Sequence, residues 1–357
     1  MVDVRKGMPS VQLSKAEFAR RFRDRFFDPA FDKLKSEIDS VIDTAWTAYD
    51  EYRKNPRTRR AGKEFSDPDY NLPVEWLATR ERLRQAEIRQ KRRTGPSRIL
   101  LINGSARSDK SCPGEMSKTF RLVKRVKSIV GREPGFKCDV LDLSRLTSEY
   151  GRNIHPCKAC VSTAQPLCHW PCSCYPNFAM GQVADWMSEI YPMWAAAHGV
   201  MIITPVNWYQ APSTLKLMID RLVCADGGNP DPTSTQGKNP TLAKEIELAG
   251  WPYPRHLAGR VFSVVAHGDA AGVETLARNL SDWLSDIGMI AAGHKAVLGT
   301  YVGYLRPYAT SHDDLDRDTA FQDEVAEAAK SLIEAVGMMR AGKLRQPGAG
   351  LREIRPK

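Results

Sequence analysis

Five cysteines crowd one short segment of the chain, and their residue type and spacing suggest chemistry. The 357-residue chain has eight cysteines, and these five fall within 18 residues: Cys157, Cys160, Cys168, Cys172 and Cys174. In a chain that we expect to be cytoplasmic, clustered thiols bind metal or perform redox chemistry more often than they form structural disulfides. Four thiolates suffice for an iron–sulfur cluster or a zinc ion, whereas packed thiols or a redox pair need no metal. The spacing leaves these alternatives open. Within the same segment, we expect His169 to be a solvent-facing loop residue rather than a ligand.

A second candidate site follows the apolar run Arg98–Asn103. Small and hydroxyl-bearing residues fill the next positions, and a helical pattern begins near Glu115. Small residues let successive backbone N–H groups turn inward, and the following helix adds its positive end, so the segment predicts an anion site. The candidate ligands are Ser105, Arg107, Ser108, Ser111 and Ser117. The segment matches neither glycine-rich nucleotide pattern, and an ordinary polar turn is the alternative.

Two further segments lie where apolar runs end. The first contains Thr204, Pro205, Val206, Asn207, Trp208 and Tyr209, and the second contains His267 and Gly268. Trp208 and Tyr209 offer aromatic surface for a planar ligand, with core packing as the alternative. His267 is a candidate ring contact or proton donor, with a structural role as the alternative. If these runs are neighbouring parallel strands, all three segments lie at one edge of a sheet.

The periodicity of the middle of the chain supplies such a sheet. Short apolar runs predict five strands, over Arg98–Asn103, Phe136–Leu143, Gly199–Thr204, Val261–Ala266 and Ile290–Leu298. Helical patterns separate them, over Glu115–Val130, Phe178–Ala197, Ser213–Cys224 and Gly272–Ile287, and Asp318–Arg340 follows the last strand. This alternation is typical of a doubly wound α/β sheet. Residues 225–258 are rich in Gly, Pro and Asn and predict a long functional loop.

The two ends of the chain differ from its middle. Residues 1–96 predict a helical extension without strands, whose aromatic stripe packs on the main domain or on a second subunit. Residues 97–340 predict the α/β domain, and residues 341–357 a basic tail. The net charge of +10 lies on the ends, since residues 98–339 carry −1. We therefore expect no nucleic-acid partner, and no apolar run is long enough to span a membrane.

Two of these segments together resemble the NADPH-dependent FMN reductase family of flavodoxin-like proteins. They are Gly104-Ser105-x-Arg107 after the first strand, and Thr204–Tyr209 followed by the helix Ser213–Arg221 after the third. The resemblance covers about residues 98–300. It implies a flavodoxin-like, five-stranded, doubly wound parallel sheet that binds FMN through the candidate anion loop, the Thr204–Tyr209 segment and His267-Gly268.

The resemblance also implies an activity. NAD(P)H would be the co-substrate, passing hydride to the flavin, with a quinone, free flavin, nitro compound or azo compound as acceptor. Relatives commonly place their site at a subunit interface, so a homo-oligomer, a dimer or tetramer, is expected.

Two other functions remain as alternatives. Iron–sulfur flavoproteins of the same fold carry a [4Fe–4S] cluster on four compactly spaced cysteines, which would make this chain an electron-transfer protein. Here seven residues separate Cys160 from Cys168, so the spacing departs from that pattern. The second alternative is a non-enzymatic binding protein that uses its basic ends.

Overall fold

The centre of the molecule is a parallel sheet. The computed structural model describes residues 12–51, 57–175 and 185–345. The strands run in the order β4, β3, β5 and β6, with β7 and β8 both beside β6. Their bounds are Ser97–Asn103 (β3), Phe136–Asp142 (β4), Gly199–Pro205 (β5), Val261–Gly268 (β6), Ile290–Ala291 (β7) and Val297–Tyr301 (β8). This is the flavodoxin-like strand order, and it confirms the predicted doubly wound sheet.

The fifth strand position differs from the prediction of one strand over Ile290–Leu298. It is divided into β7, which pairs with the beginning of β6, and β8, which pairs with its end. The interruption contains Gly293, whose φ of +89° does not fit an extended strand. The sheet therefore has five positions and six separate strands.

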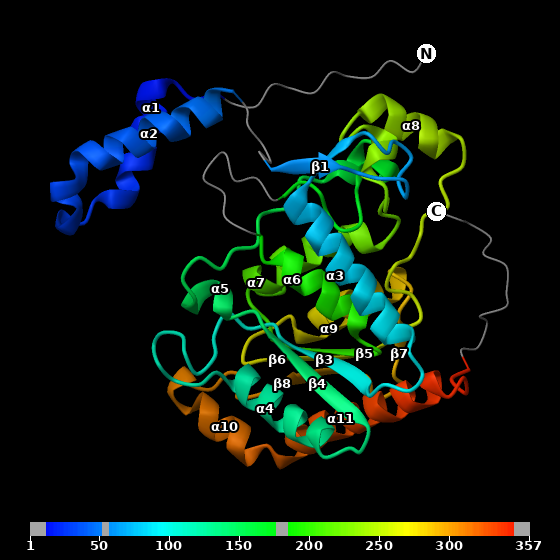
Figure 1. The fold of residues 1–357 in the computed structure, drawn as a ribbon. Helices are drawn as coiled ribbons and strands as arrows, with labels where there is room; N and C mark the ends of the chain where they lie inside the picture. Colours follow the sequence, from blue (N-terminus) through cyan, green and yellow to red (C-terminus); the bar gives the residue numbers. More distant parts are fainter. Residues whose placement is uncertain (1–11, 52–56, 176–184, 346–357) are drawn as a thin grey trace.

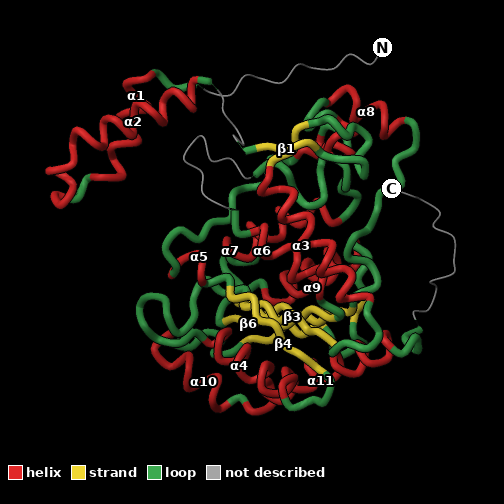
Figure 2. Tube along the Cα trace, in the orientation of Figure 1, coloured by secondary structure: helices red, strands yellow, loops and turns green. Residues whose placement is uncertain are grey.

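Helices cover both faces of the sheet (Figures 1 and 2). One face carries α3 (Val74–Lys91), α6 (Met187–Ala196), α7 (Ser213–Arg221) and α9 (Val273–Asp286). The other carries α4 (Lys118–Gly131) and α11 (Thr319–Arg340). Short helices α5 (Arg145–Ser148) and α10 (Ser311–Arg317) lie in the connections. Both faces of β6 are buried throughout, which explains why its sequence is a continuous apolar run. Residues 178–184 of the helix predicted over 178–197 lie outside the described residues.

The N-terminal extension contains a two-helix hairpin, formed by α1 (Lys15–Arg23) and α2 (Lys35–Asp50), and Pro29 lies in the connection between them. Its aromatic stripe packs largely on itself, since the Phe18 ring lies 4.9 Å from that of Tyr49. Figure 1 shows this hairpin apart from the layers of the sheet, whereas α3 packs on α6.

Two predictions about irregular segments were wrong. The extension does contain strands, because β1 (Thr58–Arg60) and β2 (Asn71–Pro73) form an antiparallel pair. The predicted loop 225–258 contains helix α8 (Pro240–Leu248). The side chain of Asn239 caps α8 and Pro240 is its first residue, so the sequence carried a start signal that Gly and Pro content obscured.

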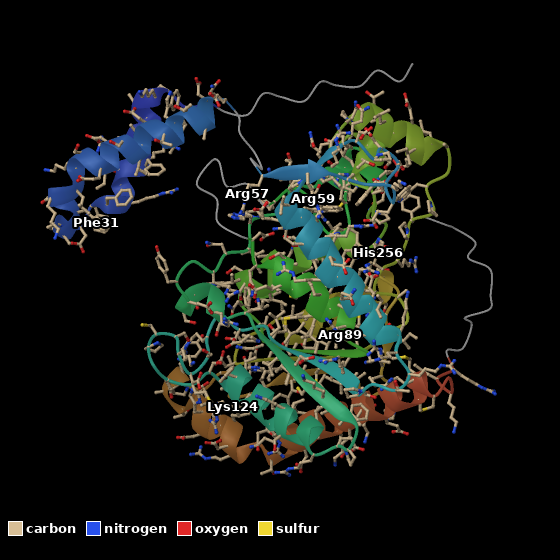
Figure 3. The ribbon with its side chains drawn as sticks, viewed as in Figure 1. Phe31, Arg57, Arg59, Arg89, Lys124 and His256 are labelled. Atoms are coloured by element: carbon tan, nitrogen blue, oxygen red, sulfur yellow. The ribbon has the colours of Figure 1, made fainter. Side chains whose placement is uncertain are left out.

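None of the described helices is long and apolar enough to cross a membrane. The basic side chains labelled in Figure 3 lie on different layers: Arg57 and Arg59 at the β1 strand, Arg89 on α3, and Lys124 on α4 across the sheet.

His198, which directly precedes β5, links the end of α3 to the beginning of β3. Its Nδ1 accepts a hydrogen bond from the Arg98 backbone N–H (3.0 Å), so its Nε2 carries the hydrogen and donates to the Gln90 carbonyl (2.9 Å). A second proton would have to occupy Nδ1 and displace the Arg98 bond. Burial, together with the nearby Arg340, Arg260 and Arg98, lowers the pKa of His198 to about 4.

Acidification should therefore weaken the fold through His198. In the unfolded chain the imidazole takes up a proton near its ordinary pKa of about 6.5, whereas the folded protein resists protonation until about pH 4. The contribution of His198 to the free energy of unfolding is therefore present above pH 6.5 and is lost as the pH falls. The expected loss between pH 7 and pH 5 is about 2 kcal/mol. Urea unfolding at pH 5, 6 and 7 measures the free energy of unfolding of the wild type and of His198→Gln. If both proteins lose the same free energy of unfolding between pH 7 and pH 5, the assignment to His198 is contradicted.

Candidate functional site

A cavity of about 430 Å³ opens at the carboxyl ends of β3, β5 and β6. A second cavity, of about 540 Å³, shares Asn207, Asp269 and Tyr308 with it. The predicted residues that line one or both cavities are Ser105, Arg107, Ser117, Pro205, Val206, Asn207, Trp208, Tyr209 and His267. The structure thus brings the three predicted segments together at the edge of the sheet where ligands of doubly wound proteins bind.

The loop after β3 is held in shape by its own side chains. Asn103 Nδ2 donates to the Arg107 carbonyl (3.2 Å), and Asn103 Oδ1 accepts from the Ser105 N–H (3.2 Å). Ser111 Oγ accepts from the Ser108 N–H (2.9 Å), so these two predicted ligands stabilise the loop and lie outside the cavity lining. Ser105 and Arg107 are the residues of this loop best placed to contact a ligand.

Arg107 presents an unsatisfied donor at the cavity. One guanidinium nitrogen donates to the Glu115 carbonyl (2.9 Å), but Nε is buried without a hydrogen-bond partner. A buried N–H of a charged group without an acceptor is costly, and an anionic ligand in the cavity would supply one. This orphaned donor and the positive charge of Arg107 favour an anion at the loop.

The beginning of α4 adds positive charge. Ser117 caps the helix by accepting from the Phe120 N–H (3.1 Å), and its hydroxyl donates to the Arg107 carbonyl (2.9 Å). Ser117 therefore joins the helix start to the loop. The next residue, Lys118, lines the cavity and pairs with Asp269 at 3.1 Å. The positive end of the helix, Lys118 and Arg107 together favour an anion.

The Asn207–Gln210 turn holds two aromatic side chains at the rim. The backbones of Asn207 and Gln210 bond each other in both directions (2.9 Å each), and the two residues between them have positive φ, +48° for Trp208 and +63° for Tyr209. Non-glycine residues rarely adopt this conformation. The turn leaves Trp208 94% and Tyr209 59% exposed beside the second cavity. Core packing, the alternative reading of the two residues, does not occur, and their aromatic faces are available to a ligand.

Two predicted residues, Thr204 and Val206, pack closely against glycines of neighbouring loops. Thr204 is fully buried, and a Cβ added at Gly104 would lie 2.7 Å from its Cβ, so the close approach requires glycine. In the same way, a Cβ at Gly268 would lie 2.4 Å from Cγ1 of Val206.

His267 lies at the floor of the cavity as a neutral residue. It is buried, and its Nε2 lies 2.9 Å from Thr119 Oγ1. Burial and then the nearby Lys118 lower the pKa of His267 to about 3, against the opposing effect of Asp269. It therefore carries no extra proton to give near neutral pH, and its contact with Thr119 joins β6 to α4.

Several cavity residues were not in the predicted set. Lys118 comes directly after the predicted residue Ser117, and Asp269 comes directly after Gly268. A prediction that located the start of α4 and the extent of the loop after β6 exactly would have included both. Tyr308, Ser311 and His312 come from the connection after β8 and close the far side. That connection carries no motif, and only the three-dimensional structure brings it to the site.

The five clustered cysteines lie elsewhere, and none of them lines either cavity. The sulfurs of Cys160 and Cys174 are 3.4 Å apart. Among the described residues, which include all eight cysteines, no group of three or more His, Cys, Asp or Glu side chains is arranged to hold a metal ion. The predicted metal ligands Cys157, Cys160, Cys168, Cys172 and Cys174 therefore form no such group among the described residues.

Residues far along the chain fix this cysteine segment. The backbones of Cys168 and Trp170 both bond that of Asn229 (2.7 and 2.8 Å). The Trp170 ring stacks on His256, labelled in Figure 3, at 4.9 Å. His169 was expected to face solvent, but it is fully buried, with its ring nitrogens 2.5 Å from Ser173 Oγ and 3.0 Å from Thr235 Oγ1. Residues 225–258 therefore cover the cysteines.

Comparison with protein families finds one match. Its sequence model, described as NADPH-dependent FMN reductase, matches residues 97–302. The iron–sulfur flavoprotein of Methanosarcina thermophila is 23% identical over 247 residues, covering 69% of this chain and 98% of that protein. Among solved structures, RosB bound to 8-demethyl-8-formylriboflavin-5′-phosphate is 14% identical, with a TM-score of 0.47, and covers 73% of this chain and 95% of its own. An apo NADH:FMN oxidoreductase is 15% identical, with a TM-score of 0.35, and covers 71% and 92%.

Replacing Arg107 tests the phosphate position. Arg107→Met is expected to weaken FMN binding roughly 10- to 100-fold, because a hydrogen bond from a charged donor contributes about 1.5–3 kcal/mol. Riboflavin, which lacks the phosphate, should bind the variant and the wild type alike. Fluorescence titration with both ligands measures the difference. Lys110→Met removes the same charge from an exposed position of the same loop and should change neither affinity. Equal losses for FMN and riboflavin would place the phosphate elsewhere.

Proposed function

The chain belongs to the NADPH-dependent FMN reductase family, and from this we propose that it oxidises NAD(P)H and reduces a small planar acceptor by means of FMN bound at the carboxyl edge of the sheet. Membership makes the chain an FMN-containing NAD(P)H oxidoreductase, which favours an enzyme over the binding-protein alternative. When bound, FMN supplies the hydride and electron chemistry. The remaining roles belong to the residues around the cavity.

The observation that carries the proposal is the buried, unpartnered Nε of Arg107. It supports a bound phosphate, with the Ser105 hydroxyl, Lys118 and the beginning of α4 beside it. The Lys118–Asp269 pair links the phosphate side of the cavity to the loop after β6, and so supports a role in positioning that loop.

The residues near the proposed flavin ring set its surroundings. Pro205, Val206 and Asn207 come directly from the end of β5, next to His267 at the end of β6. Since His267 is neutral, it adds no positive charge beside the ring. Trp208, Tyr209 and Tyr308 border the second cavity, and their exposed rings support an aromatic acceptor such as a quinone, free flavin, nitro compound or azo compound.

An iron–sulfur centre stays the alternative suggested by the name of the Methanosarcina relative. No group of thiols arranged to hold a metal is found among the described residues, and no step of the proposed activity passes through a cluster or a zinc ion. Iron and zinc analysis of the purified protein is the direct test.

A homo-oligomer is the second part of the proposal. Tyr308 and Trp208, which line the second cavity, are 76% and 94% exposed, and Leu305, three residues before Tyr308, is 87% exposed. Burial of such apolar surface favours association. Light scattering should give a dimer or tetramer of the 40.0 kDa chain. A monomer at micromolar concentration would contradict this part alone.

The activity makes a spectroscopic prediction. The purified protein should be yellow, or become so on addition of FMN, and anaerobic NADH or NADPH should bleach the flavin absorbance with one nicotinamide oxidised per flavin. Addition of a quinone should restore the absorbance. Arg107→Met should lose the signal at FMN concentrations that saturate the wild type. A colourless protein that fails to bind added FMN would overturn the proposal.

A further inference from the structure

A lysine from a distant part of the chain contacts the cysteine segment. Lys238 comes from the segment before α8, more than 60 residues beyond these cysteines. Its Nζ donates to the Leu167 carbonyl (2.8 Å) and lies 3.7 Å from Cys160 Sγ.

Two of the thiols touch. Cys160 begins a short 3₁₀ helix and Cys174 lies 14 residues later, yet their sulfurs are 3.4 Å apart. A disulfide bond is about 2.05 Å long, so the sulfurs need to approach by only about 1.4 Å. Both residues are partly exposed, whereas Cys168 and Cys224 are buried. A dissolved reactant therefore has access to the touching pair.

The surroundings distinguish Cys160 from its neighbours. Its sulfur lies 3.7 Å from Lys238 Nζ and 3.4 Å from the Cys174 sulfur. A thiolate is the nucleophile in thiol–disulfide exchange, and a nearby cation favours it.

We propose that Cys160 and Cys174 form a reversible dithiol–disulfide centre, a second redox site that reacts with low-molecular-weight disulfides such as oxidised glutathione. The contact between the two sulfurs, their access to solvent and the adjacent Lys238 carry this inference, which is independent of the flavin site.

The exchange takes place in two steps. Cys160 thiolate attacks one sulfur of the small disulfide, forming a mixed disulfide and releasing the first thiolate. Cys174 then loses its proton and attacks the Cys160 sulfur, closing the Cys160–Cys174 bond and releasing the second thiolate. The released thiolates take up the protons that the cysteines give up. Two protein thiols are oxidised, and one small disulfide is reduced to two thiols.

Oxidised glutathione, used on the full-length protein, tests the centre. After incubation at pH 7 and blocking of the remaining thiols with iodoacetamide, peptide mass spectrometry should find a Cys160–Cys174 link and the loss of two free thiols. Cys174→Ser should stop at a glutathione adduct on Cys160, and Cys160→Ser should form neither product. Cys157→Ser, a change in the same segment, should leave the link intact.

Lys238 gives a second, kinetic readout. Lys238→Met should slow adduct formation at pH 7 roughly tenfold, the effect of about one pKa unit on the thiolate fraction, and Lys238→Arg should restore most of the rate. Flavin absorbance reports folding in every variant, because no cysteine of the cluster lines the cavities. Unreactive thiols in a protein that binds FMN would overturn the proposal. A link between another pair, or stoichiometric iron or zinc protecting the thiols, would overturn it as well.

Discussion

The whole molecule depends on covering both faces of a parallel sheet whose central strands are buried. Strands such as β6 cannot face water, so helices must pack on each side, and the chain supplies them before, between and after the strands. The N-terminal segment contributes to this cover through α3. His198 bonds the end of α3 to β3, and Arg340 at the end of α11 donates to the carbonyls of Arg92, Arg93 and Gly95 just beyond it. The C-terminal helix thus holds the connection between the extension and the sheet.

The same cover explains where the proposed flavin site lies. Helices fill the faces of the sheet, so the free space is at the carboxyl ends of the strands, where the chain leaves the sheet in loops. Gly104 and Gly268 allow neighbouring loops to approach Thr204 and Val206 more closely than any side chain would permit. The close packing beneath the loops leaves their polar groups to face outward, and it positions Arg107, Lys118 and the Trp208 turn around one cavity.

The sequence predicted the sheet well because burial of a parallel strand leaves a local signature. Four apolar runs correspond to strands β3 to β6 within one or two residues, and the loops after them contain the main site residues. The failures concern features that are decided by distant contacts. The break between β7 and β8, the β1–β2 pair, and the closure of the site by Tyr308 and Ser311 depend on partners far along the chain. The internal bonds of Ser108 and Ser111 could not be distinguished from ligand contacts, because serine serves either role.

The cysteine segment shows the same limit most clearly, because spacing alone could not decide among metal, redox and packing roles. Lys238 distinguishes them. Its Nζ lies 3.7 Å from the Cys160 sulfur, where the ammonium charge favours a thiolate. Reduction of the Cys160–Cys174 pair provides a thiolate beside Lys238, whereas a disulfide provides none. The lysine therefore stabilises the reduced form relative to the disulfide. A disulfide whose reduced form is stabilised has a higher reduction potential than a structural one, so the charge that makes Cys160 reactive also keeps its oxidation reversible.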